Sequence, residues 1–177
     1  MRRILIAALI FSCLVAVRQA GAADSPASSV LDPLTIYAGT WKIDATYAQT
    51  PYSTARAEHS ILRTSCWSSP GYYTCSEARL SRPATLVVYS YDPRVHGFFA
   101  YYIPVVPGRP VRGASISAVG NVWTIFVKTT DRLGKALELR TVNTFSGNDA
   151  FDYEQDYSLD GTTWTRMSSG RQTRLHS

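Results

Sequence analysis

The stretch Gly39-Thr40-Trp41-Lys42-Ile43-Asp44-Ala45-Thr46-Tyr47 opens the part of the chain that decides the fold. Its odd positions from Trp41 to Tyr47 are apolar or aromatic, and the even positions between them are polar or charged. Successive side chains of a β-strand point to opposite faces, so this alternation predicts a strand with one buried face. The same pattern is sharpest at Phe151–Tyr157, where aromatic side chains and Gln155 alternate with Asp152, Glu154 and Asp156.

Strand patterns follow one another from Trp41 to about Leu175, separated by turn signals such as Pro70-Gly71, Gly120-Asn121 and Asp160-Gly161. Further strands are expected at about 57–67, 72–80, 84–91, 96–105, 112–119, 123–130, 137–145, 151–157 and 163–174. Proline lacks the donor that a sheet needs, so the proline-rich stretch 104–110 is expected to be a loop or an edge. Gly170 is expected to mark a bulge, and Asp32 to Ala38 a short helical turn with Pro33 in its first position.

About ten strands joined by short sequential connections favour one architecture. A Greek-key sandwich needs at least one long crossing connection, whereas an up-and-down meander can close on itself and remove its edges. The sequence therefore predicts an all-β fold, a single antiparallel up-and-down β-barrel of about ten strands within one domain, residues 34–177. No composition break indicates a second domain.

The first residues resemble an export signal. Arg2 and Arg3 precede an apolar run from Ile4 to Val17, and Ala20-Gly21-Ala22 offers a cleavage site. We expect a signal peptide over 1–22, a flexible leader over 23–33, and a protein exported to the periplasm or secreted, with no transmembrane segment after signal removal. A rival interpretation, lipid anchoring through Cys13, rests on a poor match to a lipoprotein cleavage box.

Charge excludes one class of function. Loss of the signal would lower the net charge from +5 to about +2, and the remaining arginines are scattered along the chain. Nucleic-acid binding needs a concentrated basic surface, so we expect no nucleic-acid partner.

Two cysteines, Cys66 and Cys75, follow the signal. They flank Pro70-Gly71 symmetrically, so a hairpin centred there would place them opposite each other, within reach of a bridge. Disulfides persist outside the cytoplasm, and a Cys pair with this gap is a poor zinc or redox motif. The sequence predicts a structural disulfide.

The order of several motifs resembles a known superfamily. Gly39-Thr40-Trp41 after a short N-terminal turn is similar to the Gly-x-Trp signature of calycins, which include lipocalins and fatty-acid-binding proteins. Tyr91-Asp92-Pro93, Trp123, the segment Tyr157–Trp164 and Thr173-Arg174 resemble bacterial calycin-like domains of unknown function. The resemblance implies a barrel in which an arginine packs on Trp41, with Gly39 and Trp41 in structural roles.

Three arginines near the end of the barrel segment are candidates for the contact with Trp41: Arg166, Arg171 and Arg174. The sequence does not choose among them, although pairing of the first and last strands would bring Arg174 to Trp41. One ten-stranded relative, nitrobindin, holds haem through a C-terminal histidine. The corresponding candidate, His176, is the penultimate residue and is expected outside the barrel, so no cofactor is expected.

A ten-stranded barrel is wide enough to hold a ligand as well as side chains. The candidate lining residues of such a cavity are aromatic: Tyr47, Tyr89, Trp123, Phe151 and Tyr153. The expected partner is a small hydrophobic or amphipathic molecule bound in the barrel interior. The alternative is that these rings simply fill it.

Catalytic and metal-binding patterns are weak. The carboxylates of Asp152, Glu154 and Asp156 alternate with the aromatic face, so a solvated outer face is expected. His59, next to Glu58, and His96 lack metal-site spacing, and no nucleophile or nucleotide motif is present. We expect no metal and assign no catalytic residue. Two alternatives stay open: an enzyme of the same fold, and an interaction module with a filled barrel that docks a partner through Phe98–Tyr102.

Overall fold

The computed structural model describes residues 30–79 and 82–176. The expected signal peptide, the lipidation alternative at Cys13 and most of the expected leader lie outside the described residues. The last leader residues belong to the fold, because Leu31 is buried and the short helix η1, Asp32–Tyr37, begins beside it. Within the described residues, no helix combines the length and the apolar character that crossing a membrane requires.

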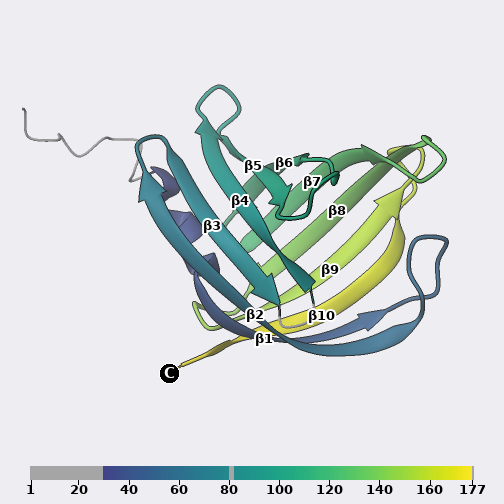
Figure 1. Ribbon diagram of the computed structural model, residues 1–177, viewed down its shortest axis with the longest axis horizontal. Helices are drawn as coiled ribbons and strands as arrows, with labels where there is room; N and C mark the ends of the chain where they lie inside the picture. The colour runs from purple at the N-terminus through teal and green to yellow at the C-terminus, as the bar shows by residue number, and fades with distance from the viewer. Residues whose placement is uncertain (1–29, 80–81, 177) are drawn as a thin grey trace, which may run out of the picture.

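Ten antiparallel strands form one closed barrel (Figure 1). In chain order they are β1 Gly39–Tyr47, β2 Arg56–Ser69, β3 Tyr72–Arg79, β4 Arg82–Asp92, β5 Gly97–Pro104, β6 Arg112–Val119, β7 Val122–Thr130, β8 Ala136–Phe145, β9 Ala150–Ser158 and β10 Thr165–Leu175. Each strand pairs with its neighbours in sequence. The predicted all-β, up-and-down barrel is confirmed, and the proline-rich stretch forms most of the β5–β6 loop.

The barrel closes between the first and last strands. In Figure 1, β1 and β10 lie side by side, and their register runs from Thr40 opposite Leu175 to Tyr47 opposite Ser168. Trp41 stands directly opposite Arg174 in this ladder. Closure removes the two free edges that an open sheet would expose.

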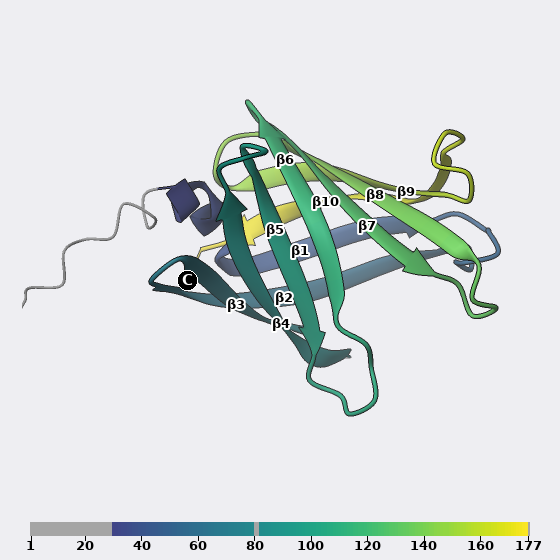
Figure 2. The same cartoon turned by 90° about the horizontal axis from the view of Figure 1, so that it is seen from above.

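Helix η1 covers one end of the barrel (Figure 2). Leu34 is fully buried there, and the Tyr37 ring makes edge contacts with Trp123, Phe145 and Phe151 at centroid distances of 5.6–6.2 Å. Such offset and perpendicular ring contacts stabilise a core beyond simple area burial. This aromatic floor closes one end, while the loops β1–β2, β7–β8 and β9–β10 lie at the opposite end (Figure 2).

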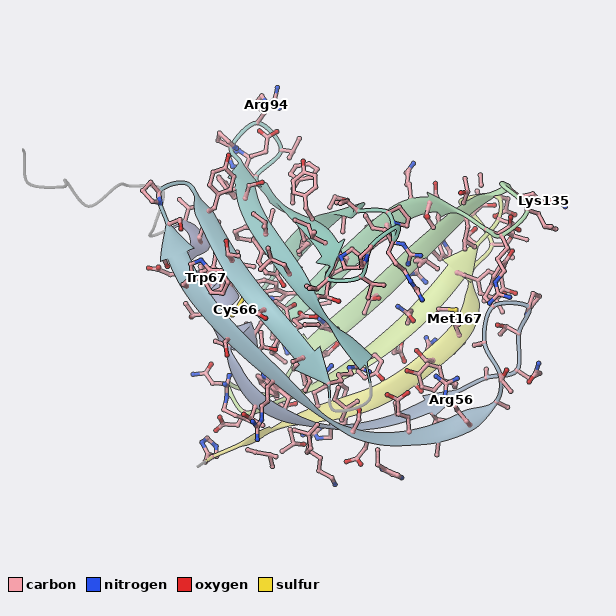
Figure 3. All side chains as sticks on the ribbon, viewed as in Figure 1. Arg56, Cys66, Trp67, Arg94, Lys135 and Met167 are labelled. Carbon is pink, nitrogen blue, oxygen red and sulfur yellow. A yellow bond between two sulfur atoms is a disulfide. The ribbon has the colours of Figure 1, made fainter. Side chains whose placement is uncertain are left out.

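The predicted disulfide is confirmed. Cys66 and Cys75 are direct cross-strand partners in the β2–β3 hairpin, with a Cα–Cα distance of 4.1 Å. Cys75 is fully buried and belongs to the core near η1. Figure 3 shows Cys66 and Arg56 toward opposite ends of β2, so the bridge belongs to the floor end of the barrel.

The prediction of a bulge at Gly170 is wrong. The register between β9 and β10 shifts between Arg166 and Ser168, beside Met167 (Figure 3), while Gly170 pairs regularly with Ala45 and Tyr153. A Cβ at Gly170 would lie 2.9 Å from both the Ala45 Cα and the Tyr153 ring. The glycine therefore marks a close approach of another backbone and a ring, the other common reason for glycine in a strand.

Candidate ligand-binding site in the barrel

A cavity of about 320 Å³ lies inside the barrel, above the aromatic floor. Trp41, Phe151 and Ile116 form part of its apolar wall, and Thr64 and Gln155 belong to its polar wall. This volume is at the lower end of the range for small-molecule sites, which are mostly apolar with a few well-placed polar groups. The interior is therefore not completely filled by side chains.

The carboxyl group of Glu77 is the unusual feature of the cavity. Strand β3 turns Tyr73, Cys75 and Glu77 inward through its two-residue period, and Glu77 lines the cavity. Burial raises the pKa of Glu77, and the nearby Arg79 only partly opposes that effect. Among residues 30–79 and 82–176, no hydrogen bond or ion pair reaches the Glu77 carboxyl.

A second inward carboxylate, Glu58, has the opposite surroundings. Arg79 Nη1 lies 3.1 Å from Glu58 Oε1, and Arg56 Nη2 lies 3.4 Å from Glu58 Oε2. The Arg56 guanidinium also lies 3.7 Å from the centroid of the Tyr47 ring. Two arginines therefore converge on Glu58, and neither forms an ion pair with Glu77.

Tyr37, Tyr89 and Tyr102 line the same cavity as Glu77. Tyr37 Oη accepts a hydrogen bond from Asn143 Nδ2 at 3.0 Å. Burial raises the pKa of Tyr37, Tyr89 and Tyr102, and the Glu77 charge adds to the rise in all three. These phenols are neutral at physiological pH. In the described part of the chain, the hydroxyls of Tyr89 and Tyr102 have no hydrogen-bond partner.

The cavity continues to a mouth beneath the β5–β6 loop. A second space of about 670 Å³ shares Glu77, Tyr102 and Gln155 with the first, and extends to Val106 and Pro110. Arg109 and Arg112 line this mouth as well. Both arginines are exposed, and neither forms an ion pair with a residue that the structure describes.

The β1–β2 loop lies across another part of the same end. The Tyr52 ring packs edge-on against Tyr157, with the centroids 4.8 Å apart, and its hydroxyl lies 3.5 Å from Asp131 Oδ2 in the β7–β8 turn. Figure 3 shows Lys135 in that turn and Arg56 at the same end of the barrel. Through Tyr52, the β1–β2 loop therefore contacts β9 and the β7–β8 turn at this end of the barrel.

The structure brings together four of the five predicted lining residues. Tyr47, Tyr89, Phe151 and Tyr153 line the cavity, whereas Trp123 packs in the floor against Phe98, with the two rings 5.8 Å apart and almost parallel. Alternation assigns a residue to a face of the sheet but not to a depth along the barrel axis, which explains the different place of Trp123.

Sequence reasoning missed Tyr37, Glu77, Arg79 and Tyr102. The period of two along Tyr73, Cys75, Glu77 and Arg79 was a usable signal for Glu77, because Cys75 pairs with the inward Cys66. Tyr37 precedes the first strand, and only the position of η1 places it in the barrel.

The predicted structural residues lie at the floor end. Arg174 Cζ lies 4.2 Å from the centroid of the Trp41 ring, and Gly39 adopts φ +119° beside the same guanidinium. Arg166 and Arg171 instead point outward, to Glu154 and Asp152 respectively.

The carboxylate row on β9 lies outside the barrel, but it is not uniformly solvated. Asp152 and Glu154 are exposed, whereas Asp156 is buried, with only 4% of its surface exposed. Burial acts to raise the pKa of Asp156, but hydrogen bonds from Arg140 (2.8 Å) and Arg166 (2.6 Å) outweigh it, so the pKa is lowered. The loop after β9 covers this cluster through Trp164, whose ring lies 4.4 Å from the Arg140 guanidinium.

The three histidines lie away from the cavity. His59 hydrogen-bonds Asp44 at 2.7 Å on the outer face, His96 lies in the β4–β5 turn near the Tyr91 hydroxyl, and His176 is exposed beside Asp149. Within residues 30–79 and 82–176, no three His, Cys, Asp or Glu side chains form a group that could hold a metal ion.

No protein-family model matches this chain. A comparison with curated proteins also finds no match. Among solved structures, the chain is similar to the crystal structure of Rv2717c from M. tuberculosis, with 12% sequence identity and a TM-score of 0.49. That alignment covers 83% of this chain and 98% of the other.

Proposed function

We propose that this protein is an exported, calycin-like binding protein that takes a small, partly apolar molecule into the barrel. The observation that carries the proposal is the cavity of about 320 Å³, which joins a mouth under the β5–β6 loop. Its wall combines aromatic rings with a few inward polar groups, the composition typical of small-molecule sites.

The apolar part of the ligand would pack against Trp41 and Phe151, near the floor. Polar groups of the ligand would replace the water that otherwise hydrates Glu77, Tyr89 and Tyr102, because buried polar groups need hydrogen-bond partners. Displacement of such water by matching polar groups preserves those hydrogen bonds and favours a specific orientation.

The test is a cavity-filling variant with a matched control. Thr141 faces inward on β8 and lines the cavity, whereas Thr144, on the same strand, is exposed. Thr141→Trp should abolish binding of the uncharged fluorescent probe N-phenyl-1-naphthylamine, measured by titration, and Thr144→Trp should leave it unchanged. Equal probe binding by both variants would remove the cavity as the site.

A second candidate function is an enzyme acting on a small molecule, and one observation favours it. Glu77 places a carboxyl group in the cavity, and burial raises the pKa of this carboxyl. Such a group is suited to general acid–base catalysis. Such an enzyme would convert a bound molecule with a rate that Glu77→Gln reduces by about a hundredfold or more. Release of the native ligand unchanged, after extraction and mass spectrometry, would favour binding alone.

A further inference from the structure

We propose that the molecule bound in the barrel carries an ammonium group, which the Glu77 carboxylate holds among the rings and hydroxyls of Tyr37, Tyr89 and Tyr102. This inference rests on the proposed binding function and names the chemistry of the buried end of the ligand.

The first step is the contrast between the two inward carboxylates. Glu58 is held by Arg56 and Arg79, whereas Glu77 has no partner in the described parts of the chain. An ionised carboxylate removed from water is costly unless a counter-charge or several hydrogen bonds compensate for it. Arg79 does not fill this role, because its Nη1 is 3.1 Å from Glu58. A cationic ligand group would supply the missing partner.

The second step is the set of phenols that line the cavity together with Glu77. Tyr37 and Tyr89 have nearly parallel rings with centroids 6.5 Å apart, and Tyr102 lines the same cavity. Neutral phenol oxygens accept hydrogen bonds. The hydroxyls of Tyr89 and Tyr102 can therefore accept hydrogen bonds from the ammonium N–H groups that do not bond to the Glu77 carboxylate. The faces of aromatic rings also attract cations, most strongly where water is excluded.

The third step excludes other occupants of this position. The Glu77 carboxylate would repel an anion. A metal ion needs several ligands, but Glu77 offers one carboxylate, and the described residues contain no group of three His, Cys, Asp or Glu side chains that could bind it. The mouth arginines, Arg109 and Arg112, do not prevent entry of a cation, because both are exposed and solvent screens them.

The experiment compares three probes of similar shape by isothermal titration calorimetry: phenethylamine, phenethyl alcohol and hydrocinnamate. The amine should bind the native protein about tenfold more tightly than the alcohol, the effect expected of one charge-assisted hydrogen bond. Glu77→Gln should bring the amine to the affinity of the alcohol and leave the alcohol unchanged. Tyr102→Phe, which keeps the ring, should weaken the amine several-fold by removing one acceptor.

The matched control is Glu154→Gln, the same replacement on the outer face of β9, and it should bind all three probes as the native protein does. Equal affinities of amine and alcohol, or no effect of Glu77→Gln, would overturn the ammonium assignment while binding of the alcohol upheld the barrel function. Tighter binding of hydrocinnamate than of the amine would also overturn the ammonium assignment, and would indicate instead that Arg109 and Arg112 at the mouth bind the carboxylate of the ligand. Absence of binding by all three probes, together with unchanged probe fluorescence in Thr141→Trp, would overturn both proposals.

Discussion

Gly39 and Arg174 share one small space at the floor of the barrel. A Cβ built at Gly39 would lie 2.5 Å from Arg174 Nη1, and the backbone of Gly39 has φ +119°. The guanidinium fills the space that a side chain at residue 39 would take. From there it lies over the Trp41 ring, with its Cζ 4.2 Å from the ring centroid.

Replacement of Gly39 by alanine should therefore destabilise the protein by about 1–3 kcal/mol. The new Cβ meets both a backbone conformation that side chains rarely adopt and the guanidinium beside it. The measurement is urea denaturation followed by tryptophan fluorescence. Gly113→Ala is the control, because no atom lies within 3.8 Å of a Cβ there and no positive φ is required. Equal losses in the two variants would refute this account of Gly39.

Arg174→Lys should cost about 1–3 kcal/mol, although the charge is kept. Arg174 donates from Nη1 to the Ala38 carbonyl, from Nη2 to the Ile36 carbonyl at 2.8 Å, and from Nε to the Asn148 carbonyl at 3.0 Å. Lysine cannot reproduce this planar set of donors or the stacking on Trp41. Part-buried hydrogen bonds from a charged donor are among the stronger ones.

Arg171→Lys on the same strand is the matched control for this variant. Arg171 is exposed and pairs with the exposed Asp152, and such pairs contribute about 0–1 kcal/mol. A thermal or urea unfolding series in which the two lysine variants lose the same stability would show that Arg174 acts only as another surface charge.

The sequence predicted the strands and their order because the period of two is local information. It also predicted the register of one hairpin, since Cys66 and Cys75 flank Pro70-Gly71 symmetrically. The choice among Arg166, Arg171 and Arg174 was not local. Only closure of the barrel, which places Arg174 opposite Trp41, decides it.

The candidate site was only partly predictable, for the same reason. Tyr47 and Tyr153 follow from alternation within single strands. Glu77 was missed because a charged residue in a strand is normally taken to face water. Its alternation with Cys75 indicates the inward face only when the Cys66–Cys75 bridge is taken to lie inside the barrel. The cavity exists only where side chains from many strands meet.

Asp156→Asn should destabilise the protein by about 1–3 kcal/mol at neutral pH. It removes the charge that accepts hydrogen bonds from Arg140 and Arg166, and Asp156 is buried. Because the folded-state pKa of Asp156 is lowered, its stabilising effect is complete above the ordinary aspartate pKa of about 3.9 and is lost as pH falls through the folded value.

Urea titrations of the native protein and Asp156→Asn at successively lower pH measure this effect. The difference in unfolding free energy should shrink as the pH falls below about 4. A difference that stays constant over the acid range would mean that the carboxylate charge contributes nothing and that only the shape of the side chain matters.

Glu77 should behave in the opposite sense, and its effect is measurable without any ligand. The charged and titratable groups that share its cavity and mouth lie on several elements: Arg79 on its own strand, Tyr89 on β4, Tyr102 on β5, Tyr37 in η1, and Arg109 and Arg112 at the mouth. Glu58 on β2 acts through Arg79, with which it forms an ion pair. Burial dominates, and the folded-state pKa of Glu77 is raised. The folded chain therefore holds this proton more tightly than the unfolded chain does.

Stability contributed through Glu77 should thus fall as pH rises from the ordinary glutamate pKa of about 4.3 through the folded value. Glu77→Gln, which cannot ionise, should be more stable than the native protein by roughly 1 kcal/mol at neutral pH, and the gain should vanish in acid. Glu154→Gln, at an exposed position, should show no such gain. If Glu77→Gln were less stable than the native protein at neutral pH, the Glu77 carboxylate would have a compensating partner within the protein, and the ammonium proposal would lose its basis.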